Sequence, residues 1–180
     1  MRLRIFGLAA WLLATAAQAA PLRDPGTGLT VNPPPGYVAT AKPPDQRHAA
    51  TISIKRSGDS DEGCEVGFLP AAGNARFSQE QINTLVGTPA WRDAIVARLA
   101  PVYEVTDTAL VEVNGIRGMV LLGDFKPRRD LPPRARQMRN FFAVLETPRG
   151  HTNIVCVAEK DSFRQRQPEF EGVVRGTTAP

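Results

Sequence analysis

The sequence predicts an α+β fold, in which a largely antiparallel sheet packs against a central helical pair and a C-terminal helix. Three observations predict it. Asn114-Gly115 joins two apolar segments, a strong hairpin signal because both turn residues need positive φ. Two helix starts follow one another at Ser78 and Thr88, and residues 162–174 have helical spacing. Strands joined by hairpins pair antiparallel, and helices grouped at two places must cover the faces of the sheet.

The early segments predict three short strands. Residues 28–32 (GLTVN) read as a strand that ends at Pro33, because a proline cannot donate to a ladder. Residues 49–55 alternate isoleucines with polar residues, which is typical of a half-buried strand. Residues 64–69 (CEVGFL) form the third.

The helical pair is predicted from its caps. Ser78 and Gln81 form a capping box, so a first helix runs from there to about Val86. Thr88 then caps a second helix with Pro89 at its first position. One apolar stripe along this helix is expected to face the core: Trp91, Ile95, Val96 and Leu99.

The second half predicts a meander of four strands and a final helix. Residues 109–113 and 116–125 form one hairpin, and residues 141–146 and 152–159 form another. The last helix covers residues 162–174, with Pro168 expected to bend or divide it. Its apolar residues should point at the sheet: Phe163, Phe170 and Val173.

Residues 1–19 have the three parts of a secretory signal. Arg2 and Arg4 precede an apolar run, and Ala17-Gln18-Ala19 supplies the small residues for cleavage after Ala19. An uncleaved anchor is the alternative. Later segments all fall short of the roughly eighteen apolar residues of a membrane span, so the processed chain is not expected to be membrane-spanning. We expect a periplasmic or secreted protein with a flexible lead-in at residues 20–27 and one domain at residues 28–180.

Charge and cysteine usage limit the function classes. Removal of residues 1–19 takes away two basic residues and no acidic one, so the net charge falls from +4 to +2. This small excess gives no reason to expect a nucleic-acid partner. The two cysteines, Cys64 and Cys156, are expected to form a disulfide in an oxidising compartment.

The layout resembles the PsbP-like α/β sandwich, which includes the periplasmic DcrB-type proteins. The resemblance rests on the strand that leads into Pro35-Gly36-Tyr37, on the two central helices, on the meander and on the final helix. It spans most of residues 28–174 and depends on pattern and spacing. The resemblance implies a non-catalytic accessory or binding protein, and it carries no site residue across.

The most unusual segment is residues 126–139 (KPRRDLPPRARQMR), which carries six basic residues and one acid, Asp130. We expect a projecting loop, which is a candidate for electrostatic contact with anionic lipid headgroups, an acidic partner protein or a phosphate-bearing ligand. The alternative is a solvated loop whose cations pair with surface acids. The basic residues are Lys126, Arg128, Arg129, Arg134, Arg136 and Arg139.

No catalytic, metal or cofactor site is expected, because the usual nucleophile, zinc and phosphate-binding motifs are missing. His48 and His151 are expected in exposed loops. The acidic group at residues 59–65 is expected to be a solvated turn. The sequence therefore predicts a binding or accessory module. A carrier of a small apolar or lipidic ligand, and an envelope hydrolase with a non-standard site, remain as alternatives.

Overall fold

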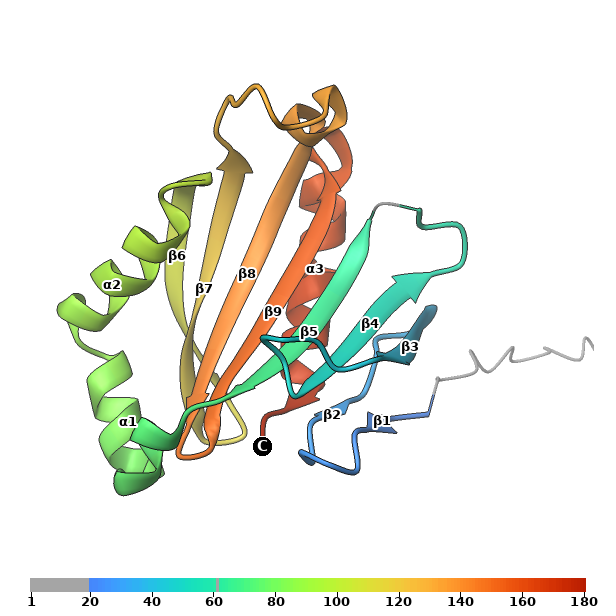
Figure 1. The fold of residues 1–180 in the computed structure, drawn as a ribbon. Helices are drawn as coiled ribbons and strands as arrows, with labels where there is room; N and C mark the ends of the chain where they lie inside the picture. The colour runs from blue at the N-terminus through green and yellow to red at the C-terminus, as the bar shows by residue number, and fades with distance from the viewer. Residues whose placement is uncertain (1–19, 61) are drawn as a thin grey trace, which may run out of the picture.

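The computed structural model describes residues 20–60 and 62–180, so the predicted signal at residues 1–19 lies outside the described residues. It confirms the α+β class. Seven antiparallel strands form one sheet in the order β3-β4-β5-β9-β8-β7-β6 (Figure 1). The strands are β3 (Tyr37–Lys42), β4 (Ala50–Arg56), β5 (Gly63–Pro70), β6 (Tyr103–Val113), β7 (Ile116–Phe125), β8 (Met138–Thr147) and β9 (Gly150–Glu159).

The strands β6 to β9 form the predicted meander, and each neighbour in the sequence is also a neighbour in the sheet. Asn114 and Gly115 have φ angles of 53° and 77°, so both adopt the left-handed conformation that this tight turn requires. The strands are longer than predicted at several ends. The strand β6 begins at Tyr103, six residues before its predicted start, and β8 begins at Met138, three residues before its predicted start.

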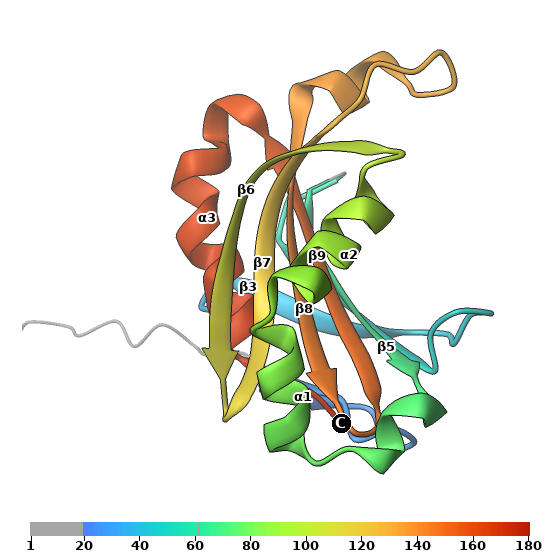
Figure 2. The same ribbon diagram turned by 90° about the vertical axis from the view of Figure 1, so that its left-hand side faces the viewer.

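Helices cover both faces of the sheet (Figure 2). On one face lie α1 (Gln79–Val86), with its capping box, and α2 (Pro89–Leu99), which Thr88 caps. On the opposite face lies α3 (Lys160–Arg175), which continues unbroken through Pro168. Two short 3-10 helices, η1 (Ala72–Arg76) and η2 (Pro133–Gln137), lie in the connections.

The core is divided between the two faces. The larger cluster lies under α3, where Phe163, Phe170 and Val173 are buried as predicted. Phe170 is fully buried and its ring packs against the rings of Phe141 and Phe163. The smaller cluster lies under α2, where Ile95 packs with residues of β7 and β8.

The N-terminal region differs from the prediction. Residues 20–27 are not a loose lead-in, because β1 (Leu22–Arg23) pairs with β2 (Thr30–Val31), which also pairs with β10 (Thr177–Thr178). The Asp24 carboxylate closes the intervening turn by accepting hydrogen bonds from the Thr27 amide and hydroxyl, both at 2.7 Å. The strand β2 lies within the strand predicted at residues 28–32, whereas its partners β1 and β10 are two residues long and too short to show a sequence period.

The disulfide prediction is confirmed. Cys64 on β5 and Cys156 on β9 lie directly opposite one another in the sheet, with a sequence separation of 92 residues. The bond therefore joins the early strands to the meander. Among the described residues, no helix is long and apolar enough to cross a membrane.

Candidate functional site

The basic segment connects β7 to β8 and extends beyond the end of the sheet (Figure 2). Its second half is the short helix η2, which buries Ala135 and exposes the arginines on either side. Five of the six predicted basic residues are exposed, and the sixth, Arg139, lies within β8 and is half-buried.

Three of the six cations are neutralised by carboxylates. Arg139 forms a two-pronged pair with Asp124, with N–O distances of 2.9 and 3.0 Å. This hydrogen bonding lowers the pKa of Asp124 against the opposing effect of burial. Arg128 pairs with Asp130 inside the loop, at 2.6 Å.

The third ion pair joins Arg134 to Glu159 at the end of β9, with an N–O distance of 2.5 Å. It anchors the loop to the rest of the molecule. The cations without such a carboxylate are Lys126, Arg129 and Arg136, which we call the free basic triad. All three are exposed, and none forms an ion pair or side-chain hydrogen bond with any residue that the structure describes. The loop therefore carries its unneutralised charge on these three residues.

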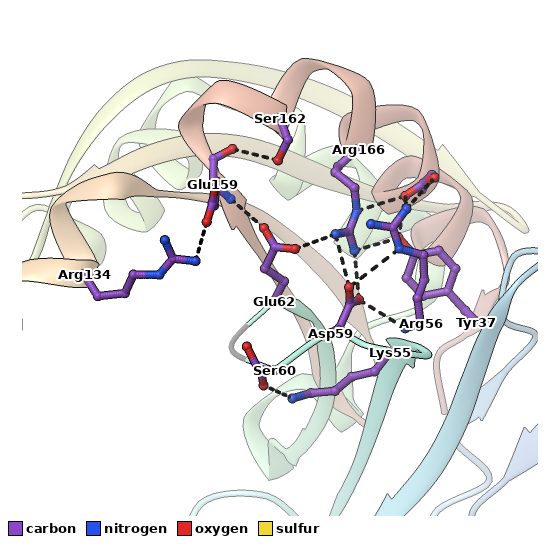
Figure 3. A network of polar contacts seen from close by, with 11 residues as sticks. Tyr37, Lys55, Arg56, Asp59, Ser60, Glu62, Arg134, Glu159, Ser162 and Arg166 are labelled. Carbon is purple, nitrogen blue, oxygen red and sulfur yellow. Dashed lines mark hydrogen bonds and ion pairs between the residues drawn. The ribbon is translucent and has the colours of Figure 1, made fainter.

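A buried polar network supports the base of this loop, and its centre is Arg166 on α3 (Figure 3). The side chain of Arg166 is only 4% exposed, and its guanidinium lies 3.0 Å from Asp59 and 2.9 Å from Glu62. Its Nε lies 3.0 Å from Glu169, and its Nη2 donates to the Tyr37 hydroxyl at 3.0 Å. One guanidinium thus binds three carboxylates and a phenol.

The network corrects the expectation of a solvated acidic turn. The Asp59 side chain is 6% exposed and that of Glu62 is 19% exposed, and both are bound to Arg166. Asp61 lies outside the described residues. Among the residues that are described, no group of three His, Cys, Asp or Glu side chains is placed to hold a metal ion. The arginine occupies the position between the carboxylates that a cation would take.

The electrostatics follow from this geometry. Burial raises the pKa of Asp59, but hydrogen bonds from the Arg56 backbone and Arg166, with the charges of both arginines, outweigh burial and lower the pKa overall. Burial and a hydrogen bond to Glu169 raise the pKa of Tyr37 to about 12. Asp59 is thus held charged and Tyr37 is held neutral across the physiological range.

The network and the loop are physically connected. Glu62 accepts a hydrogen bond from the backbone amide of Glu159 at 2.9 Å, and the Glu159 carboxylate pairs with Arg134. Together with neighbouring polar residues, these side chains line an open polar pocket of about 540 Å³ below the loop. The chain of contacts from Arg166 to Arg134 therefore fixes the position of the loop relative to the sheet.

The two histidines are less exposed than predicted. His151 lies within β9, where its Nδ1 is 2.5 Å from the buried carboxylate of Glu146. The turn that ends at Gly150 leads directly into strand pairing, so the expected loop position of His151 is wrong. His48 lies in the connection between β3 and β4, as expected, but it is half-buried. It covers Gly67 of β5, because a Cβ atom at Gly67 would lie 2.5 Å from the imidazole.

A second, apolar pocket of about 370 Å³ lies between α2 and the face of β5, β8 and β9. Glu146 and His151 lie at one side of it, where a smaller pocket of about 110 Å³ continues toward α1. Sequence reasoning expected the stripe on α2 to be covered by the sheet. Ile95 is buried and Leu99 packs against the same cluster, and both residues also line the pocket.

The sequence held one usable signal for the buried network. Arg166 lies three residues after Phe163 and four before Phe170, so it falls on the apolar face of the helix. A charge in that position needs a buried partner of opposite sign. Only the fold shows that Asp59 and Glu62, which lie between β4 and β5, are two of these partners.

Comparisons with known proteins bear on the fold. No protein-family model matches the chain, and no curated protein matches it. Among solved structures, the chain is similar to the solution structure of cyanobacterial PsbP (CyanoP) from Synechocystis sp. PCC 6803, with a TM-score of 0.58 and 8% sequence identity. The similarity covers 96% of this chain and 98% of that one. The chain therefore has the PsbP-like fold that the sequence predicted, and similarity at this level of identity establishes the fold alone.

Proposed function

We propose that this PsbP-like chain is an exported, non-catalytic binding module that engages an anionic partner in the cell envelope through its basic loop. The partner is an acidic protein surface or an anionic envelope component. Cleavage near Ala19 would release the domain into the periplasm or the medium, where the disulfide is stable.

The observation that carries the proposal is the free basic triad. Lys126, Arg129 and Arg136 project three positive charges that no described carboxylate neutralises. Clustered charge of one sign on a protruding segment accelerates encounter with an oppositely charged surface and selects against like-charged ones. In contrast, the ion pairs at the base of the loop have an anchoring role, because they hold its start and end against the sheet.

The buried charges support a binding role over a catalytic one. Arg166, Asp59 and Glu62 neutralise one another within one network, as expected of groups that hold a helix to a sheet. The loop can then present its triad from a rigid base, which reduces the entropy lost on binding.

The test is affinity isolation from periplasmic extract at low salt, with native mass spectrometry to identify proteins and small ligands. The variant K126Q/R129Q/R136Q removes three charges from the triad. A matched control, R47Q/R76Q/R164Q, removes three exposed cations elsewhere on the surface. The proposal expects the wild type and the control to retain the same partner and the triad variant to lose it. Equal retention by all three proteins would contradict it.

A further inference from the structure

The apolar pocket between α2 and the sheet combines a hydrophobic wall with unused polar groups. Its apolar lining comes from several elements and includes Leu69, Ile95, Leu99, Phe142, Val144 and Val155. Apolar pockets with a few polar groups are the usual form of a small-molecule site. This one is separate from the basic loop, and the inference is independent of the function proposed above.

Three of the polar residues that line the pocket carry side-chain donors that bond to no residue the structure describes. Arg98 is exposed on α2, and its guanidinium forms no ion pair or hydrogen bond within residues 20–60 and 62–180. The Tyr103 hydroxyl and the Asn153 side-chain amide also form no hydrogen bond with the described part of the chain. The ring of Tyr103 is held by Phe125 and Phe142, both at 4.8 Å between centroids.

The one acid in the lining is already engaged. Glu146 is buried, and its Oε2 accepts from Asn74 at 3.2 Å and lies 2.5 Å from His151 Nδ1. The groups left to meet a ligand therefore include three donors, one of them permanently cationic. That set complements a carboxylate, because an arginine binds a carboxylate through two parallel hydrogen bonds.

We infer that this pocket binds a medium-chain monocarboxylic acid, with the hydrocarbon chain against the sheet and the carboxylate at Arg98. A volume of about 370 Å³ is near the small end of the range for ligand pockets, which favours one short chain over a diacyl lipid. The smaller pocket shares Ile95, Arg98, Glu146 and His151 with it and provides room for a longer chain.

The test measures the binding of octanoate and decanoate to the protein without residues 1–19 by isothermal titration calorimetry. Burial of two further methylene groups should tighten binding by about fifteenfold, because each contributes about 0.8 kcal/mol. Removal of the charge in R98Q should weaken decanoate binding about tenfold. The control R164Q makes the same change on α3, on the opposite face, and should bind as the wild type does.

Two further measurements decide whether the pocket and the head group are assigned correctly. V155W fills the pocket from the sheet side and should abolish binding. Because this variant changes a half-buried residue, its circular dichroism spectrum is compared with that of the wild type. If the spectrum shows an altered fold, the test of the binding site rests on R98Q alone. Decyltrimethylammonium has the same chain with a cationic head. If it binds as tightly as decanoate, if no acid binds, or if R98Q binds as the wild type does, the inference is overturned.

Discussion

Among single substitutions in the polar network, replacement of Arg166 by methionine should lower the stability of the fold the most. Methionine keeps much of the length and apolar volume of the side chain but removes the guanidinium. The change leaves Asp59, whose side chain is 6% exposed, without its closest cation, and it deprives Tyr37 of a donor. Arg56 remains as the nearest positive charge, 3.7 Å from Asp59 and 3.4 Å from Glu169.

The expected loss follows from burial. Removal of one partner from a buried ion pair costs about 3–5 kcal/mol, because the other charge is left desolvated. Arg56 is more exposed than Arg166 and compensates only in part. We therefore expect R166M to lower the free energy of unfolding by about 3 kcal/mol at pH 7. For a domain of this size, that corresponds to a drop of roughly 10 °C in Tm.

The assay is urea denaturation of R166M and of a matched control, R164M, whose side chain is exposed two residues earlier on α3. The pH dependence gives a second readout. The pKa of Asp59 is lowered in the folded protein, so its contribution to stability is present above the unfolded pKa of about 4 and is lost as the pH falls through the folded value. The gap between wild type and R166M should therefore be widest above about pH 5 and narrow below about pH 4.

The double variant D59N/R166M isolates the cause, because a neutral amide has no charge to leave unpaired. It should regain part of the stability that R166M loses. The reasoning is refuted if R166M and R164M unfold at the same urea concentration at pH 7, or if the loss in R166M is independent of pH.

Three further predictions concern the core and the titrating groups. The variant C64A/C156A should lose about 4–5 kcal/mol in urea denaturation, because the bond closes a loop across 92 residues of separation, and unchanged stability would contradict this. In an absorbance titration of the folded protein at about 295 nm, Tyr37 should ionise near pH 12 and Tyr103 above pH 10, whereas both should ionise near pH 10 in the unfolded chain. Ionisation of either tyrosine at pH 10 in the folded protein would be inconsistent with its burial. The variant F170A should lose about 3–5 kcal/mol, and a loss below about 1 kcal/mol would show that its site is not tightly packed.

The elements that were predicted correctly carry local signals. The caps at Ser78 and Thr88 locate the helical pair, and Asn114-Gly115 locates the hairpin, because each is decided by residues within one turn of the chain. The strand β3 was missed. It lies at the edge of the sheet, and Val38 is 60% exposed, so the alternation of Tyr37–Lys42 is weak. In the small sheet, β2 lies within the predicted strand, whereas β1 and β10 were missed because two residues are too few to show a sequence period.

The candidate site was predictable only in part. The excess of positive charge in residues 126–139 is visible in the sequence. Which of these cations are paired depends on the fold, because it places Asp124 next to Arg139 and Glu159 next to Arg134. The network at Arg166 joins residues far apart in the sequence, such as Asp59 and Arg166, which are separated by 107 positions. The apolar pocket likewise depends on the packing of α2 against the sheet, and no local sequence pattern predicts that packing.

The role of the free basic triad is tested most directly by the salt dependence of affinity for the isolated partner. The dissociation constant is measured at about 50 and about 300 mM salt, where the screening length changes from more than about 10 Å to well under it. The wild type should bind at least about tenfold more weakly at the higher salt, and K126Q/R129Q/R136Q should bind weakly at both. Affinity that is unaffected by salt and equal in the two proteins would show that the triad does not contact the partner.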